Sequence, residues 1–375
     1  MKKDTQCVHS GTYPDPQTRG LNTPIFTSSS FEYIGMPENV YPRYFNTPNQ
    51  KTIVEKLCAL ENAEDGLIFS SGMAAISTAI LSFVSSGDHI VLQRDIYGGT
   101  HHFATAEFNK FGIQYTFVTN KSSDIESAFR ENTKIIYIES PSNPLLLITD
   151  IEAVARIAKS KNILTVIDNT FATPINQNPL DLGIDIVLHS GTKYIGGHSD
   201  ICCGVALASE KLIAIIKESA ANFGGSLNAI TCYLIERSLK TLAIRIAKQN
   251  LNALAIAKHL QTNSSIKKMY YPGLENHPDF ATAAKQMKAF GGMLSFELDA
   301  QKVDPHGFLE KLNLIKPALS LGGVETIICA PVATSHQKMS NEERAELGIT
   351  NSLLRLSVGI EDSDDLIADL EQALR

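Results

Sequence analysis

Short apolar runs alternate with helical patterns from about residue 50 onward. The runs at residues 89–92, 113–118, 135–138 and 163–167 each have the length of a buried strand. A helical pattern that opens with an Asp cap, residues 150–160, lies between the last two runs. Strands that alternate with helices in this way predict a mostly parallel sheet with helices on both faces, which is an α/β fold.

Two further apolar runs lead into polar turns that contain glycine. The run at 67–69 is followed by the small-residue turn 70–73 and then by an apolar helix. Free N–H groups and the helix dipole meet at such a turn, so it predicts a phosphate site. The run at 184–188, in which only Asp185 is polar, predicts a buried strand. The loop 190–200 follows its carboxyl end, where open α/β sheets bind ligands.

The pattern changes toward both ends of the chain and divides it into three parts. Residues 1–50 are rich in Pro, Asn, Thr, Ser and aromatic residues without a sustained period, which predicts an extended arm that packs on the main body or on a neighbouring subunit. Residues 51–240 carry the alternating strands and helices. Residues 241–375 are predicted to form a smaller C-terminal α+β domain.

Three patterns near or within the C-terminal part support that division. A single long helix is predicted over residues 230–260, where Ala and Leu recur at helical spacing. Glycine-marked strands are predicted at 291–298 and 353–358. The chain closes with a predicted helix at 362–374, whose first residues are acidic and suit the positive end of the helix dipole.

Composition narrows the class of protein. The 375 residues are 43% hydrophobic and 19% charged with a net charge of −7, which is typical of a globular protein. Without a Lys/Arg stripe this charge does not favour a nucleic-acid partner. The six cysteines show no CxxC pair and no metal-ligand spacing, so reduced thiols and no metal are expected. No targeting or membrane-spanning segment is recognised, which predicts a cytoplasmic protein with no membrane partner.

Lys193 is the first candidate for chemistry. It lies between Thr192 and Tyr194 and precedes the paired glycines Gly196 and Gly197, which together have the parts of an amine nucleophile beside an anion-binding cradle. An exposed lysine in a polar loop is the alternative for this stretch taken alone. The rest of the chain favours the first interpretation.

Three polar groups are predicted to lie at strand ends of one sheet: Lys193, Asp168 and the turn 70–73. A lysine, a carboxylate and a phosphate cradle fit pyridoxal phosphate, with Lys193 forming the Schiff base and Asp168 pairing with the pyridine nitrogen. The protonated pyridine is an electron sink, and the aspartate stabilises its charged form. Tyr97 offers a flat ring that can stack on the cofactor.

The lysine segment 190–200 resembles the cofactor-lysine signature of the Cys/Met-metabolism pyridoxal-phosphate enzymes. This family includes cystathionine γ-synthase, cystathionine β- and γ-lyases, methionine γ-lyase and O-acylhomoserine sulfhydrylases. The resemblance covers nearly the whole chain in the same order and implies a PLP-dependent transferase fold of the aspartate aminotransferase type, fold type I. The other matching segments are 41–43, 71–73, 97–100, 139–144, 168–170, 271–274, 320–325 and 354–359.

The resemblance implies a role for each residue of the cofactor site. Lys193 would carry the cofactor and move the α-proton of the substrate, with Tyr97 stacked on the cofactor and assisting as an acid or base. Asp168 would hold the pyridine nitrogen, and Asn143 would contact the phenolic oxygen. The groups that would hold the phosphate are the backbone N–H groups of Gly72 and Met73 and the hydroxyls of Ser190 and Thr192.

The resemblance also implies contacts beyond the cofactor. Tyr41 and Arg43 would reach the phosphate held by a neighbouring subunit, which requires a homodimer at least; family members are typically tetramers, built as dimers of dimers. Arg355 would bind the substrate α-carboxylate in a bidentate fork, with Ser320 and Asn143 beside it.

The activity implied is that of a carbon–sulfur lyase of trans-sulfuration. Such an enzyme removes the α-proton and eliminates a thiol from cystathionine or a related sulfur amino acid such as methionine. Loss of the thiolate from Cβ is β-elimination, and loss from Cγ requires a second proton removal at Cβ. The alternative is a transferase that performs γ-replacement on an acylated homoserine, as cystathionine γ-synthase and O-acylhomoserine sulfhydrylase do.

Three positions depart from the family members that handle cystathionine. Those members typically carry two acidic residues and an arginine where this chain has Val40, Leu319 and His102. A charged distal end of the substrate therefore finds fewer partners, which favours methionine γ-lyase-like or broad carbon–sulfur lyase activity. Neighbouring residues with polar groups can compensate for this loss; they are Glu32, Glu38 and Tyr44.

Overall fold

The apolar runs form the larger of two sheets. In this computed structural model, which describes residues 1–334, 337 and 340–375, seven strands lie in the order β1-β7-β6-β5-β4-β2-β3. All neighbours pair in parallel except β7, which is antiparallel to β1 and β6, so the predicted mostly parallel sheet is confirmed. The sequence prediction lacks β7. The strands are β1 Asp65–Phe69, β2 His89–Gln93, β3 Gln114–Val118, β4 Thr133–Glu139, β5 Leu164–Asp168, β6 Ile186–Ser190 and β7 Gly204–Ala208.

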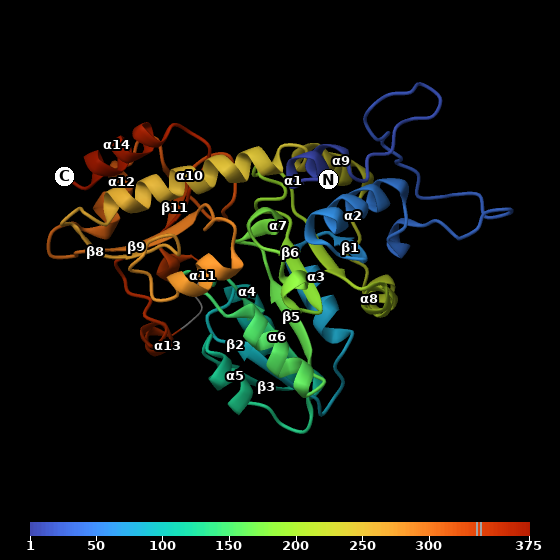
Figure 1. Cartoon of the computed structure of the whole chain (residues 1–375), viewed down its shortest axis with the longest axis horizontal. Helices are drawn as coiled ribbons and strands as arrows, with labels where there is room; N and C mark the ends of the chain where they lie inside the picture. Colours follow the sequence, from blue (N-terminus) through green and yellow to red (C-terminus); the bar gives the residue numbers. More distant parts are fainter. Residues whose placement is uncertain (335–336, 338–339) are drawn as a thin grey trace.

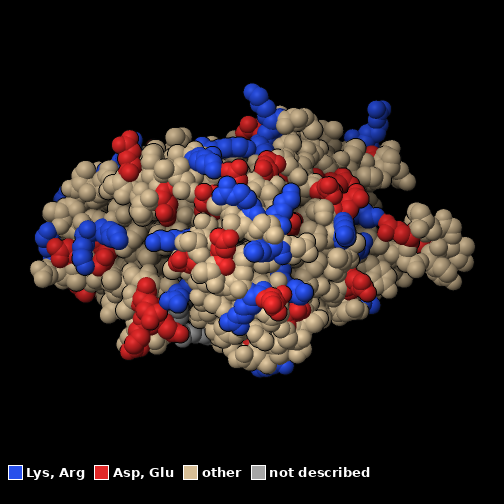
Figure 2. Space-filling view, turned by 60° about the horizontal axis from the view of Figure 1, so that its bottom comes forward, with Lys and Arg blue, Asp and Glu red and all other residues tan. Residues whose placement is uncertain are grey.

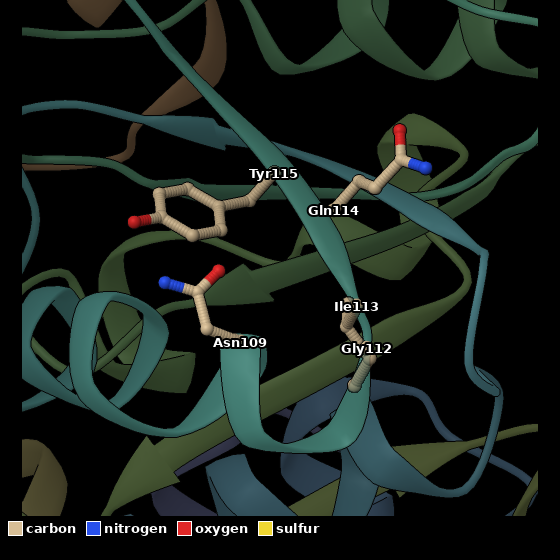
Figure 3. Close-up of a pocket in the computed structure, with 5 residues that line it drawn as sticks. All are labelled: Asn109, Gly112, Ile113, Gln114 and Tyr115. Carbon is tan, nitrogen blue, oxygen red and sulfur yellow. The ribbon is translucent and has the colours of Figure 1, made fainter.

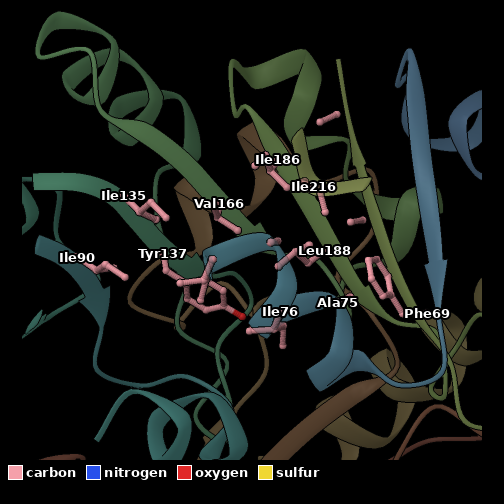
Figure 4. Close-up of a cluster of buried hydrophobic side chains, with 14 of the residues drawn as sticks. Phe69, Ala75, Ile76, Ile90, Ile135, Tyr137, Val166, Ile186, Leu188 and Ile216 are labelled. Carbon is pink, nitrogen blue, oxygen red and sulfur yellow. The ribbon is translucent and has the colours of Figure 1, made fainter. Parts of the chain in front are cut away.

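Helices cover both faces of this sheet, because successive strand residues point to opposite sides. On one face Ile76 of α3 packs in the same cluster as Val166 and Leu188 (Figure 4). On the other face Val154 of α6 packs with Ile167. The helices of this part are α3 Gly72–Leu81, α4 Gly98–Glu107, η2 Phe108–Phe111, α5 Ser122–Ser127, α6 Ile151–Ser160, α7 Thr173–Asn176, η3 Pro179–Leu182, α8 Glu210–Phe223 and α9 Ala229–Leu239.

The smaller sheet has five strands and belongs to the predicted α+β region. Its order is β10-β11-β12-β9-β8, and it is antiparallel except for the pair β10 and β11. The long helix α10 runs from the larger part of the chain to this sheet (Figure 1). The elements are α10 Leu242–Leu260, β8 Ile266–Tyr270, α11 Phe280–Gln286, β9 Met293–Leu298, α12 Pro305–Lys311, β10 Lys316–Pro317, β11 Ile327–Cys329, η4 Pro331–Ala333, α13 Asn341–Glu346, β12 Leu353–Ser357 and α14 Ser363–Ala373.

The N-terminal arm is less extended than its composition predicts. It begins with helix α1 (Lys3–His9), which packs against α2 (Pro48–Glu61). The ammonium of Lys56, a residue with 0% exposure, donates to the carbonyl oxygens of Cys7 at 3.0 Å and Val8 at 3.4 Å. A helix of this length is too short to show a helical period in the sequence. Between α1 and α2 the chain projects away from the body (Figure 1) and contains one 3₁₀ turn, η1 (Pro42–Tyr44).

The predicted single helix over residues 230–260 is two helices. Helix α9 ends at Leu239 and α10 begins at Leu242. The carbonyl oxygen of Ser238 accepts hydrogen bonds from the Thr241 N–H at 3.1 Å, the Thr241 hydroxyl at 3.1 Å and the Arg245 guanidinium at 3.1 Å. These donors replace the helical partner of that carbonyl, so the helix breaks there although the apolar spacing continues.

Two features concern the expected partners: the apolar character of the helices and the distribution of charge on the surface. Among the described helices, none combines the length and apolar character that crossing a bilayer requires. Figure 2 shows a face on which basic and acidic side chains are interspersed. A mixed face of this kind lacks the continuous basic area that attracts a phosphate backbone.

A buried polar network ties α2 to the ends of β5 and β6. The carboxylate of Glu61 accepts hydrogen bonds from the Asn169 amide at 2.9 Å and the Asn178 amide at 3.1 Å, and it lies 2.7 Å from Nε2 of His189. Glu61 and His189 are both fully buried. The network therefore holds the carboxyl ends of the two central strands against α2.

We expect Glu61→Ala to destabilise the protein strongly, because it leaves three buried polar side chains without their shared acceptor. The free energy of unfolding, measured by urea titration of the apoprotein, should fall by about 3–5 kcal/mol. The matched control Glu152→Ala removes a carboxylate from an exposed pair with Lys285, and it should cost less than about 1 kcal/mol. Equal losses in the two variants would contradict the importance of the network.

Candidate active site

The carboxyl ends of β5 and β6 bring Lys193 and Asp168 to one edge of the larger sheet. Strand β6 ends at Ser190, and the chain then makes a helical turn in which the Gly197 N–H donates to the Lys193 carbonyl at 2.7 Å. The Lys193 ammonium donates to the Ser320 hydroxyl at 2.8 Å. Loss of hydration, together with the nearby Arg355 guanidinium, lowers the pKa of Lys193 to about 8. Lys193 therefore has the depressed pKa that an amine nucleophile needs.

Asp168 is a buried carboxylate at the end of β5. Its Oδ1 accepts hydrogen bonds from the Thr170 N–H at 3.0 Å and from the Thr170 hydroxyl. Burial raises the pKa of Asp168, while these hydrogen bonds and the nearby His189 and Lys193 oppose the rise. Within the described residues no hydrogen bond reaches Oδ2, so this oxygen is available to a cationic ligand.

The predicted phosphate turn lies directly against Ser190. A Cβ atom at Gly72 would lie 2.9 Å from the Ser190 Cβ and 3.0 Å from its hydroxyl oxygen, so only glycine allows this approach. Ser71 caps α3 by accepting the Ala74 N–H at 3.1 Å. The N–H groups of Gly72 and Met73 then remain at the open end of the helix beside the Ser190 hydroxyl, an arrangement that binds anions.

Thr192 differs from the other predicted phosphate ligands. Its hydroxyl donates to the Cys203 carbonyl oxygen at 3.2 Å and accepts the Cys203 N–H at 3.0 Å. These bonds join the lysine loop to the segment that leads into β7. A role of Thr192 toward phosphate stays a prediction.

Arg355, Asn143 and Ser320 come together from distant parts of the chain. Arg355 lies on β12 and donates to the Asn143 side-chain oxygen at 2.7 Å and to the Ser320 carbonyl oxygen at 3.2 Å. Arg355 and Asn143 are buried, and the Arg355 Nε has no hydrogen-bond partner among the described residues. A buried guanidinium with an unused donor suits a carboxylate ligand.

Tyr97 stands at the start of α4 with its ring partly exposed. Its backbone N–H donates to the Glu139 carboxylate at 2.8 Å, and its ring folds over Gly99, where a Cβ atom would lie 2.4 Å from Cε1. Glu139 is a site residue that the sequence analysis assigned no role. Burial, together with the charge of Asp168, raises the pKa of Glu139 well above its usual range. Its polar character at the end of a buried strand was the available signal.

Tyr41 and Arg43 lie elsewhere in the same chain. The Arg43 guanidinium donates to the Ala221 carbonyl oxygen of α8, and it lies 5.7 Å from the Tyr41 ring centre and 5.4 Å from that of Tyr44. The described contacts do not join these residues to Lys193. Their predicted reach into a neighbouring subunit concerns a second copy of the chain and stays a prediction.

The paired glycines after Lys193 differ from the expected anion cradle, because both pack on protein atoms. A Cβ atom at Gly196 would lie 2.9 Å from Cγ1 of Ile201, and one at Gly197 would lie 2.1 Å from Nη1 of Arg245. Gly197 also has a φ of +67°, which favours glycine. The glycines therefore make room for neighbouring side chains rather than for a ligand.

A surface hollow of about 440 Å³ lies away from this site. Figure 3 shows Asn109 from η2 facing Tyr115 of β3 across it, with residues 112–114 beside them. The hollow adjoins the amino end of β3, whereas Lys193 lies at the carboxyl edge of the sheet. It is therefore separate from the site.

Comparison with known proteins decides the family. Residues 4–375 match the model of the Cys/Met metabolism PLP-dependent enzymes. The chain belongs to this family. It is 44% identical to a cystathionine gamma-lyase of Bacillus subtilis (strain 168), over 100% of this chain and 99% of the relative. It is 42% identical to a cystathionine beta-lyase of Lactococcus lactis subsp. cremoris (strain MG1363), over 99% and 98%.

The fold agrees with the family. The crystal structure of a cystathionine gamma-lyase from Lactobacillus plantarum, complexed with L-serine, superposes with a TM-score of 0.96 and 40% identity over 100% of this chain and 98% of that one. The predicted PLP-dependent transferase fold, the cofactor pyridoxal phosphate and the enzyme class are thereby confirmed.

The residues present fit this cofactor. The α3 N-terminus with Ser190 offers N–H and hydroxyl donors to a phosphate, and the free Oδ2 of Asp168 offers a charge to a pyridinium nitrogen. Lys193 offers an amine of lowered pKa. A small anionic and cationic ligand of this kind would satisfy the charges that burial has made costly.

We expect the rate at which the apoprotein binds pyridoxal phosphate to depend on the protonation of Lys193. Its pKa of about 8 means that the neutral, nucleophilic amine increases as the pH rises through that value. The rate, measured by the visible absorbance of the bound cofactor, should rise with pH and level off above the pKa. A lysine with an ordinary pKa of about 10.4 would show a rise that continues beyond pH 10. Such a profile would contradict the lowered pKa.

Proposed function

We propose that this protein is a pyridoxal-phosphate-dependent carbon–sulfur lyase that acts on a sulfur amino acid such as cystathionine. The observation that carries the proposal is the connected set of Lys193, Ser320 and Arg355. The Lys193 ammonium donates a hydrogen bond to the Ser320 hydroxyl. The backbone carbonyl of the same serine accepts a hydrogen bond from Arg355. This arrangement places a proton-accepting amine beside a carboxylate-binding guanidinium. Relatives named cystathionine gamma-lyase and cystathionine beta-lyase support the substrate class.

The bound cofactor supplies an electron sink that stabilises negative charge at Cα of an amino-acid substrate. Arg355 binds the α-carboxylate in a bidentate fork, with Asn143 and Ser320 holding the guanidinium in place. Lys193, freed as a neutral amine, takes the Cα proton. Asp168 would hold the pyridine nitrogen of the bound cofactor in its protonated form, because the buried carboxylate would gain a counter-charge there.

Elimination from Cγ requires a second proton transfer, and we assign it to Lys193. The Ser320 hydroxyl accepts a hydrogen bond from the Lys193 amine at 2.8 Å and thereby restricts its position. Tyr97 lies at the start of α4, where its ring would stack on the bound cofactor and its hydroxyl would assist proton transfer. The Glu139 carboxylate accepts a hydrogen bond from the Tyr97 backbone N–H at 2.8 Å and thereby fixes the position of the Tyr97 backbone.

The site is completed by a second copy of the chain. We assign Tyr41 and Arg43 to the phosphate of a neighbouring subunit in a homodimer that pairs into a tetramer. Exposed apolar side chains on the projecting arm, including Leu21 and Ile34, support its burial by another copy. The division into an arm (1–50), a cofactor domain (51–240) and a small domain (241–375), and a cytoplasmic location with reduced cysteines, belong to the same proposal.

Substrate preference depends on the three departures from the cystathionine pattern. Leu319 is 70% exposed and adjoins Ser320, His102 is exposed on α4, and Val40 is half-buried in the arm. An apolar group beside Ser320 offers no partner to a distal ammonium and favours a thioether with an apolar end. The second candidate function, γ-replacement on an acylated homoserine, uses the same proton transfers at Cα and Cβ.

The oxo acid formed from L-cystathionine separates these functions. We expect the purified holoprotein, incubated with L-cystathionine alone, to release pyruvate by β-elimination or 2-oxobutyrate by γ-elimination. Identification of the oxo acid by chromatography assigns the bond that breaks. Formation of neither acid, with turnover of methionine, would confine the enzyme to substrates without a charged distal end. Product that appears only when a thiol and an O-acylhomoserine are both present would contradict the lyase assignment and favour the transferase.

Variants of Arg355 and Tyr97 separate binding from proton transfer. Arg355→Lys loses the bidentate fork and should raise KM by about 10- to 100-fold, which corresponds to about 1.4–2.8 kcal/mol. Tyr97→Phe keeps the ring and loses the hydroxyl, so kcat for elimination should fall by about 10²-fold with KM little changed. Steady-state kinetics on one substrate measure both. An unchanged elimination rate in Tyr97→Phe would limit Tyr97 to stacking.

A further inference from the structure

Arg245 binds the backbone of the loop that carries Lys193. It comes from the first turn of α10, is 4% exposed, and donates from Nη1 to the Tyr194 carbonyl oxygen at 2.8 Å. From Nη2 it donates to the Ser238 carbonyl oxygen at 3.1 Å. The guanidinium thus joins the peptide next to Lys193 to the carboxyl end of α9.

The Arg245 guanidinium is compensated by carbonyl oxygens rather than by a carboxylate. In residues 1–334, 337 and 340–375, no Asp or Glu forms an ion pair with Arg245. Burial lowers its pKa to about 10, so it stays charged at neutral pH. A buried charge is costly unless its surroundings compensate. Here the compensation comes from the carbonyl oxygens of Tyr194 and Ser238, the second of which lies at the carboxyl end of α9, where the helix dipole is negative.

The same loop is held by the neighbours of Arg245. The Ser238 hydroxyl donates to the Gly196 carbonyl oxygen and accepts from Arg245 Nη2 at 3.3 Å. Nδ1 of His198 lies 2.8 Å from that Gly196 oxygen. Two carbonyl groups of the turn are therefore held by side chains: that of Tyr194 by Arg245, and that of Gly196 by Ser238 and His198.

The preceding peptide, between Lys193 and Tyr194, is also in close contact with another segment. A Cβ atom at Gly322 would lie 2.7 Å from the Tyr194 nitrogen and 3.0 Å from the Lys193 carbonyl carbon. The segment that carries Ser320 thus packs on the Lys193–Tyr194 peptide, while Arg245 binds the carbonyl of the next peptide. Gly197 leaves the space that the guanidinium fills. The Lys193 backbone therefore has little freedom to shift.

We infer that Arg245 is a positioning residue, which holds the Lys193 backbone so that the lysine amine meets the cofactor and the Cα proton in one geometry. The inference rests on the proposed role of Lys193. Displacement of a reacting group by about 1 Å can cost about 10²-fold in rate. Arg245 acts through the Tyr194 carbonyl and needs no contact with the cofactor.

The test compares Arg245→Met with a matched control, Lys56→Met. Both variants remove a buried cation that donates to backbone carbonyls, but Lys56 binds α1 and not the lysine loop. For each holoprotein we would measure the thermal midpoint, the dissociation constant of pyridoxal phosphate, and the visible absorbance and circular dichroism of the bound cofactor. These signals report how the cofactor is held and do not depend on turnover.

Both variants are expected to lose thermal stability, and only Arg245→Met should alter the cofactor. In Arg245→Met the dissociation constant of pyridoxal phosphate should rise by about tenfold, and the visible circular dichroism of the bound cofactor should weaken. The kcat should fall by about 10- to 100-fold, with KM within about twofold of wild type. Arg245→Lys keeps the charge but has a single donor nitrogen in place of the guanidinium fork, so it should recover part of each change. Wild-type cofactor signals in Arg245→Met would overturn the inference.

Two further variants keep the outcome decisive. If Arg245→Met does not fold, Arg245→Lys and Ser238→Ala take its place, and wild-type cofactor signals in both would overturn the inference. Lys193→Ala is measured in parallel. If it retains the wild-type absorbance band, the role proposed for Lys193 fails. If it loses the band while the Arg245 variants keep theirs, only the role of Arg245 fails.

Discussion

The parallel pairing of β5 with β6 is the constraint on which the site depends. Asp168 is in register with Leu188, so the buried carboxylate ends one strand where the lysine loop leaves the next. The Ser190 N–H donates to the Thr170 hydroxyl at 2.8 Å, and the same hydroxyl binds Asp168. A slip of one residue would turn each side chain to the other face of the sheet. The hydrophobic cores on both faces prevent it, since Val166 and Ile167 pack on opposite sides.

Burial gives the site its electrostatic character. It raises the pKa of Asp168 and Glu139 and lowers that of Lys193, because each charged form has lost water. Arg355 lies among these groups and lowers the pKa of Lys193 further. Such a cluster is poorly compensated within the protein alone and is well suited to a ligand that carries both a phosphate and a pyridinium. The packing of the fold holds these groups in place, and the Glu61 network at the carboxyl ends of β5 and β6 contributes to it.

Several conclusions depended only on the order of residues. The apolar runs predict the parallel strands, since a strand buried on both faces must be continuously hydrophobic. The polar groups at their ends predict Lys193, Asp168 and the turn at Gly72, because parallel strands end at one edge. The resemblance identified the family that comparison confirms. These features are local, and each leaves a pattern in the sequence. Strand β7 and helix α1 were missed because their short segments carry little periodicity.

Contacts between distant residues were decided by the tertiary structure alone. The break between α9 and α10 arises because Arg245 and Thr241 bind the Ser238 carbonyl, whereas the apolar spacing runs on without interruption. The contact of Glu139 with the Tyr97 backbone, and that of Arg245 with the loop of Lys193, are recognised only once the chain has folded. A sequence shows which residue types are present and their spacing along the chain. Which buried charge meets which carbonyl depends on the packing of segments far apart in the chain.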